Sequence, residues 1–123
     1  MVRFFFILGS FMAFLGVALG AFAAHILKTK LSSEMFSIFE VGVRYHFYHA
    51  FALFIVAWAN SYWTTKSFSI SGWLFFFGIC VFSGSLYLLS LTSVRWLGMI
   101  TPIGGVFFLL GWFFLVWNLW KTG

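Results

Sequence analysis

Four long apolar stretches follow one another along this sequence, separated by short polar segments. They cover about residues 4–24, 45–63, 68–91 and 97–120, and each holds few charged residues. A helix needs about 17–25 mainly apolar residues to cross the hydrocarbon core of a bilayer. The pattern therefore predicts an all-α membrane protein. It would be a single transmembrane domain over residues 1–123, with four helices running up, down, up and down.

The segment between the first two stretches differs from the rest because it holds both acidic residues of the chain. Ser32 is a typical helix N-cap, and Glu34 in the first turn would interact favourably with the helix dipole. A helix from Ser33 through the second stretch would be about 45 Å long at 1.5 Å per residue. The hydrocarbon is roughly 30 Å thick. We therefore expect a short interfacial helical stretch before the second span, with a bend near Gly42.

The first stretch has a second interpretation. Arg3, the apolar run and Ala21-Phe22-Ala23 together resemble a secretory signal peptide with its cleavage site. The apolar core of a signal peptide is usually about 7–15 residues long, and this run is longer. We therefore interpret the first stretch as a membrane span.

The composition favours a membrane protein over a soluble one. Of the 123 residues, 63% are hydrophobic and 7% are charged, whereas a soluble domain has roughly 25% charged residues. A net charge of +5 would suggest nucleic-acid binding in a soluble domain. Here the basic residues stand singly, mostly near span ends, where they can reach lipid headgroups. We therefore expect membrane lipids as partners and no nucleic acid.

The basic residues also bear on orientation. We name the side of the membrane that holds the connections 25–44 and 91–96 side B, and the opposite side, which holds the termini, side A. Side B carries Lys28, Lys30, Arg44 and Arg95, and side A carries Arg3, Lys66 and Lys121. By the positive-inside rule, connections 25–44 and 91–96 are predicted to be cytoplasmic.

Small residues mark faces where helices approach one another. Gly16 and Gly20 form a GxxxG motif in the first stretch, a spacing that lets helix backbones come close in lipid. Gly84, Gly104 and Gly105 offer further small positions in the third and fourth stretches. We predict that these five glycines serve packing, either within one chain or between the chains of a homo-oligomer.

Unusual polar residues gather in the half of the predicted bundle near side B. The candidate ligand-binding residues there are His25, Glu40, Arg44, Tyr45, Tyr48, His49, Ser83, Ser85, Tyr87 and Thr101. A charge inside a membrane is costly and usually faces the bundle interior or a water-filled cavity. Glu40 and Arg44 also have the spacing and order that favour a helical ion pair. We predict a polar pocket with Arg44 contacting an anion and with His25 and His49 as hydrogen-bonding partners, for binding or transport of a small or lipidic ligand.

The same residues support a structural or accessory role. Arg44 can extend to the headgroups with Glu40 neutralising it, and His25 can bond the last carbonyls of the first helix. The polar set would then stabilise the bundle or an oligomer.

Metal, haem and enzyme chemistry have less support. His25, His46 and His49 could converge on a metal or haem iron, but Cys80 is the one cysteine and there is no HExxH or CxxC pattern. We expect no metal site and no cofactor. The chain has no Asp, so a Ser/His/Asp triad cannot form, and we assign no catalytic residues. A lipid-modifying enzyme at the interface is the third interpretation.

Four motifs stand in order along the chain, and they contain most of these polar residues. They are GAFAAH at 20–25, FEVGVRYHFYHA at 39–50, FSGSLY at 82–87 and LGMITPIGG at 97–105. Together they resemble the motifs of the YgdD/YwdK family of small inner-membrane proteins, whose function is unassigned. The resemblance implies four spans and a bacterial inner-membrane location, and it marks Pro102 as a further motif position. It implies no established activity.

Overall fold

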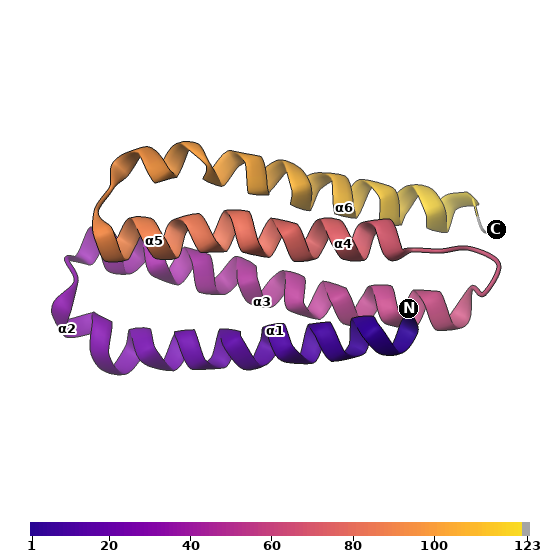
Figure 1. Cartoon of the computed structure of the whole chain (residues 1–123), viewed down its shortest axis with the longest axis horizontal. Coiled ribbons are helices and arrows are strands. Elements are labelled where there is room, and N and C mark those ends of the chain that lie inside the picture. The colour runs from indigo at the N-terminus through magenta and orange to yellow at the C-terminus, as the bar shows by residue number, and fades with distance from the viewer. Residues whose placement is uncertain (122–123) are drawn as a thin grey trace.

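The computed structural model describes residues 1–121, and it arranges them in four long helical rods (Figure 1). In chain order the elements are α1 (Val2–Phe22), the π-helical η1 (Ala23–Leu27), α2 (Lys28–Lys30), α3 (Ser33–Tyr62), α4 (Ser69–Gly78), the π-helical η2 (Ile79–Ser83), α5 (Gly84–Thr92), the 3₁₀-helical η3 (Arg95–Met99) and α6 (Thr101–Lys121). The predicted all-α class is confirmed for the described residues.

The rods form an antiparallel bundle with α3 in a central position. α1 packs along α3, which also packs against α4 and α5, and α4 packs in turn against α6. Successive rods reverse direction, so the start of α1 and the end of α6 lie toward the same end of the bundle (Figure 1). This is the predicted up-down-up-down order of helices.

The start of α3 is confirmed, but the bend is not. Ser32 caps the helix, since its Oγ accepts a hydrogen bond of 3.2 Å from the backbone N–H of Met35. From Ser33 the helix runs for 30 residues through Gly42 without interruption. Gly42 instead makes room for a ring, because a Cβ there would lie 2.8 Å from Cε1 of Tyr87. The expected interfacial stretch is therefore the first part of one continuous helix of about 45 Å.

Three of the four rods are long and apolar enough to cross a membrane, namely Val2–Lys30, Ser69–Thr92 and Arg95–Lys121. α3 is long enough to cross a membrane, but it is less apolar than the other three helices. Its side chains include Arg44, His46 and His49, which lower its mean hydropathy. The structure therefore supports three of the four predicted spans by length and composition.

Aromatic rings that lie directly on glycines bring the rods together. A Cβ at Gly72 of α4 would collide with the ring of Phe5 in α1, and a Cβ at Gly78 would collide with the ring of Phe108 in α6. Phe5 is fully buried and Phe108 nearly so. In lipid no hydrophobic force drives helices together, so this kind of close packing is a main source of helix association.

Two of the predicted packing glycines make close contacts. Gly16 lies under the ring of Phe47, whose Cε1 would be 3.0 Å from an added Cβ. Gly104 of α6 lies against the backbone of Phe82 in η2, where an added Cβ would collide with backbone atoms. Both glycines allow an approach between helices that an alanine would hinder.

The other three predicted glycines pack less closely. An added Cβ would make ordinary contacts, at 3.6 Å with Val43 from Gly20 and at 3.9 Å with Phe82 from Gly105. At Gly84 an added Cβ would meet no atom within 4 Å. Gly84 therefore makes no close packing contact within the chain, and a contact with a second chain at this position stays a prediction.

Candidate functional site

His46 is held at both ring nitrogens inside the bundle. Its Nε2 lies 2.7 Å from the backbone carbonyl oxygen of Met12 in α1, and its Nδ1 lies 2.9 Å from the hydroxyl of Tyr87 in α5. A carbonyl only accepts, so Nε2 carries a proton, and in the neutral ring the Tyr87 hydroxyl donates to Nδ1. His46 therefore connects α1, α3 and α5 at one point.

His49 is also buried and bonded at both nitrogens. Its Nδ1–H donates to the carbonyl oxygen of Tyr45 at 2.8 Å, and its Nε2 accepts from the indole N–H of Trp112 in α6 at 3.0 Å. The ring stacks on Phe108 with centroids 3.5 Å apart. Because an indole only donates, the Trp112 bond requires an unprotonated Nε2. His49 thus joins α3 to α6 and has no free nitrogen for the ligand contact predicted from the sequence.

The hydroxyl groups of the predicted set also bond inside the bundle. Ser83 Oγ donates to the carbonyl oxygen of Gly42 at 2.7 Å, and Ser85 Oγ is hydrogen-bonded to Oγ1 of Thr101. These bonds satisfy polar groups where the surrounding lipid offers no water. Ser83, Ser85, Tyr87 and Thr101 therefore lie among the contacts between helices and line neither of the two grooves described next.

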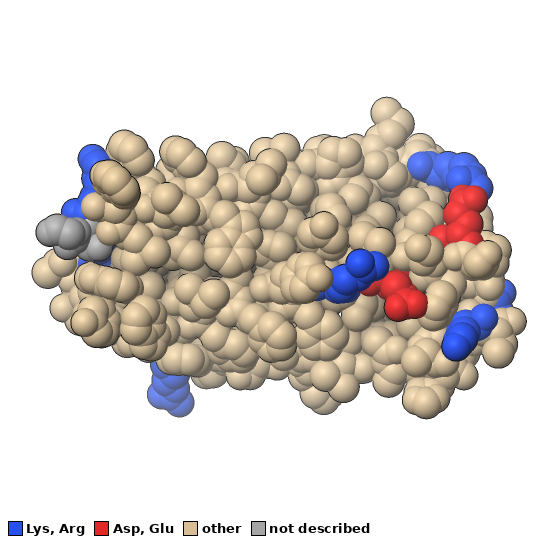
Figure 2. Space-filling view, turned by 180° about the vertical axis from the view of Figure 1, so that it is seen from behind, with Lys and Arg blue, Asp and Glu red and all other residues tan. Residues whose placement is uncertain are grey.

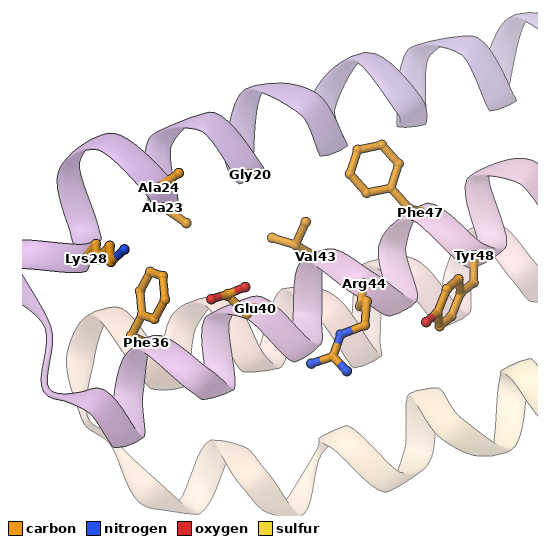
Figure 3. A pocket seen from close by; sticks show the side chains of 10 residues that line it. All are labelled: Gly20, Ala23, Ala24, Lys28, Phe36, Glu40, Val43, Arg44, Phe47 and Tyr48. Atoms are coloured by element: carbon orange, nitrogen blue, oxygen red, sulfur yellow. The ribbon is translucent and has the colours of Figure 1, made fainter.

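A groove between α1 and α3, which we call the first groove, brings charged members of the predicted set together (Figure 3). Its cavity volume is about 370 Å³. The lining residues are Gly20, Ala23, Ala24, Lys28, Phe36, Glu40, Val43, Arg44, Phe47 and Tyr48. Charged and apolar or aromatic side chains alternate along the groove. Lys28, Glu40 and Arg44 supply the charges, all from exposed positions.

Glu40 and Arg44 do not form the predicted ion pair. Within residues 1–121 the ion pair lies elsewhere, between Arg95 Nη1 and Glu34 Oε1 at 2.9 Å. Figure 3 shows the Glu40 carboxylate on the side of α3 toward α1 and the Arg44 guanidinium directed away from α1. Figure 2 shows acidic side chains in one half of the molecule, with basic side chains beside them. The Arg44 charge is therefore not neutralised by Glu40 through direct contact.

Helix geometry fixes how far Arg44 lies from the far end of α3. The aromatic residues Tyr62 and Trp63 end α3 at side A, where such rings prefer the membrane interface. Arg44 lies about 27 Å before Tyr62 along the helix axis at 1.5 Å per residue. This distance is close to the roughly 30 Å thickness of the hydrocarbon. If α3 crosses the membrane, Arg44 would lie at the level of the lipid phosphates on side B.

A second groove lies between α3 and α6, with a cavity volume of about 630 Å³. Its lining residues are Tyr45, Tyr48, His49, Phe82, Pro102, Gly105, Val106, Phe108, Leu109 and Trp112. Tyr48 lines both grooves. The nitrogens of His49 and Trp112 are bonded to protein atoms, so this second groove offers mostly aromatic and aliphatic surface.

The positions of His25 and Lys28 differ from the site predicted from the sequence. His25 is exposed in η1 and lines neither groove, so its ligand contact stays a prediction. Lys28 was missed as a site residue, although it lines the first groove. The signal was in the spacing, since Gly20, Ala24 and Lys28 are four residues apart and share one helix face.

The fold and the two grooves define this chain as a small helical integral membrane protein whose two buried histidines are hydrogen-bonded to neighbouring helices. The chain belongs to the family described as "Protein of unknown function (DUF423)", which matches residues 19–105. This membership confirms the family resemblance seen in the four motifs.

Relatives of similar length carry membrane-protein names. The chain is 47% identical over 116 residues to the UPF0382 membrane protein YwdK of Bacillus subtilis, covering 94% of each chain. It is 48% identical over 115 residues to a UPF0382 membrane protein of Staphylococcus epidermidis, covering 94% of this chain and 93% of that one. It is 44% identical over 122 residues to one of Staphylococcus saprophyticus, covering 98% and 99%. No solved structure matches the chain.

Proposed function

We propose that this protein binds a membrane lipid through its anionic headgroup, in the first groove. The observation that supports this most is that Arg44 is an exposed cation lining a groove, and a membrane-spanning α3 would put it at phosphate depth. A guanidinium can donate two parallel hydrogen bonds to a phosphate. Lys28 at the same groove adds a second cation, and with Glu40 present the three charges sum to +1. The groove therefore favours a ligand with a net negative charge.

The rest of the first groove suits an acyl chain. Gly20 has no side chain to fill the space beside Val43, which lies level with Arg44, and Phe47 presents apolar surface about one helical turn deeper in the membrane. A lipid would find a complementary surface for its headgroup and for its chain. A soluble anion would use the charged side chains alone. This difference is why we propose a lipidic ligand.

We propose in addition that α3 is the fourth span. Its polar His46 and His49 are buried and bonded inside the bundle, while the exposed face after Arg44 carries Phe51, Ile55 and Trp58. Lipid contacts the exposed face only, so the mean hydropathy of the whole helix understates how apolar that face is. We place the chain in a bacterial inner membrane with side B cytoplasmic.

The topology can be tested by labelling single cysteines in intact cells. In a Cys80→Ser background, Thr29→Cys and Thr64→Cys each place one thiol in an exposed position at opposite ends of the bundle. A membrane-impermeant maleimide is expected to label the cysteine at 64 and not the one at 29. Labelling of both, or of 29 alone, would contradict the proposed topology.

Lipid binding can be tested by native mass spectrometry of the purified protein. The wild type, in nanodiscs of phosphatidylcholine with a small fraction of phosphatidylglycerol, is expected to retain phosphatidylglycerol preferentially. Arg44→Gln should weaken this retention about tenfold, because hydrogen bonds to charged groups contribute about 1.5–3 kcal/mol.

The matched control is Lys30→Gln. It removes the same charge at the same end of the bundle from an exposed residue that does not line the first groove. It should leave the retention unchanged. If the two variants weaken retention equally, the attraction is a general surface effect and the groove is not the site. If neither weakens it, an accessory role through helix packing gains support.

A further inference from the structure

The two grooves open on either side of a single ridge of α3. Tyr48 lines both grooves, and Arg44 precedes it by one helical turn on the same face. Figure 3 shows the two side chains pointing to the same side of α3, while Val43 and Phe47 lie toward α1. A group bound to Arg44 is therefore positioned above a ridge that has the partly charged first groove on one flank and the mostly apolar second groove on the other.

We infer that the bound lipid has two acyl chains and straddles this ridge, with its phosphate on Arg44 and one chain in each groove. The inference rests on the proposed function and adds the second groove to it as the site of the second chain. The ligand class is thus a diacyl glycerophospholipid with a net negative charge.

The depth of the second groove supports this arrangement. Its lining begins with Tyr45, next to Arg44 in sequence, and with Pro102 in the first turn of α6. It extends along α6 to Trp112, about 15 Å farther at 1.5 Å per residue. The groove therefore starts at the level of the proposed phosphate and runs toward the middle of the membrane, as an acyl chain does.

The chemistry of the second groove also supports an acyl chain over a polar ligand. His49 has no free nitrogen, and the indole N–H of Trp112 already donates to it. Val106 and Leu109 are exposed aliphatic residues on the α6 side of the groove. Apolar surface of this kind gains from contact with hydrocarbon and offers little to a polar molecule.

The test compares phosphatidylglycerol with its lyso form, which has one chain, in phosphatidylcholine nanodiscs. The wild type is expected to retain the diacyl lipid about tenfold better than the lyso lipid, since the second chain buries further apolar surface. Gly105→Leu would fill the second groove from a position where a Cβ makes only an ordinary contact. It should lower retention of the diacyl lipid to the lyso level and leave lyso retention unchanged.

Two further variants make the result interpretable. Gly84→Leu adds the same side chain on α5, at a glycine that faces open space and lines neither groove. It should retain both lipids as the wild type does. Val106→Phe fills the second groove from an exposed position, and it takes the place of Gly105→Leu in the test if that variant does not fold. It should have the same selective effect on the diacyl lipid.

Each alternative has its own outcome. Diacyl retention that is unchanged in Gly105→Leu and Val106→Phe, but still lost in Arg44→Gln, overturns the second site and leaves the proposed function intact. Retention that does not depend on Arg44 overturns both. Competition by inorganic phosphate as strong as that by the lipid would identify a soluble anion as the ligand. A dimer that Val106→Phe converts to a monomer would identify the second groove as a contact between two chains. Either of these last two results also overturns the inference.

Discussion

His46 of α3 and Tyr87 of α5 are hydrogen-bonded at 2.9 Å, and the second nitrogen of the same imidazole reaches the carbonyl oxygen of Met12 in α1. The ring is almost entirely buried, with 3% of its surface exposed. The polar residues of the motifs thus divide into two groups. One group bonds the helices to one another, and the other, around Arg44, faces outward at the two grooves.

Tyr87→Phe should destabilise the fold without changing lipid binding. The variant keeps the ring that lies on Gly42 but removes the hydroxyl that donates to His46. A lost hydrogen bond between membrane helices costs about 0.6 kcal/mol on average and up to about 1.7 kcal/mol. We expect a decrease of this size in the free energy of unfolding, measured by denaturant titration in detergent.

The control for Tyr87→Phe is Tyr62→Phe, which removes a hydroxyl from a residue that is 66% exposed. Its stability should equal that of the wild type. Equal stability of all three proteins would show that the bond between His46 and Tyr87 contributes nothing measurable to the fold.

Gly104→Ala should destabilise the protein, and Gly84→Ala should not. At Gly104 the added methyl group collides with backbone atoms of Phe82, whereas at Gly84 it meets open space. Overpacking typically costs about 1–3 kcal/mol, and backbone atoms cannot turn aside as a side chain can. We expect Gly104→Ala to lower the melting temperature in detergent clearly and Gly84→Ala to leave it unchanged or raise it. A similar decrease in both variants would contradict the packing described for α6 against η2.

The helices could be predicted from the sequence because their determinants are local. The length of each apolar stretch and the cap at Ser32 both act within a few residues of where the helix forms. The missing bend at Gly42 was not predictable in the same way. The ring that fills the space beside Gly42 belongs to Tyr87, which lies 45 positions later in the chain and reaches it only in the folded bundle.

The candidate site was predictable by depth but not by direction. Placing the polar residues along the predicted spans collected them in one half of the bundle. In the structure, some of these residues line the two grooves and others form hydrogen bonds inside the bundle. Depth does not distinguish inward from outward positions, however. Arg44 and His46 are two residues apart and therefore lie on different faces of α3. Helical periodicity could have separated them, but it could not have identified Met12 or Trp112 as the partners of the two histidines.

Trp112→Phe should weaken the contact between α3 and α6. The variant keeps an aromatic ring in the second groove and removes the N–H that donates to His49 at 3.0 Å. The imidazole Nε2 is then left without a donor in a buried site, which costs about 1–3 kcal/mol. Thermal unfolding in detergent should show this decrease. Trp120→Phe at a position that is 83% exposed provides the matched control, and equal melting temperatures for the two variants would argue against a structural role for the bond.

The ion pair between Arg95 and Glu34 should contribute little to stability, although it joins η3 to the start of α3. Its side chains are 72% and 58% exposed, so water and salt screen the attraction. Exposed pairs of this kind typically contribute about 0.2–1 kcal/mol. We expect Arg95→Gln to change the free energy of unfolding by less than about 0.5 kcal/mol at physiological salt, and any difference from the wild type to shrink as salt is added. Arg95 lines neither groove, so Arg95→Gln should also bind phosphatidylglycerol as the wild type does. A large, salt-independent loss of stability would mean that the pair is shielded from water, and that side B is more enclosed than the exposed side chains indicate.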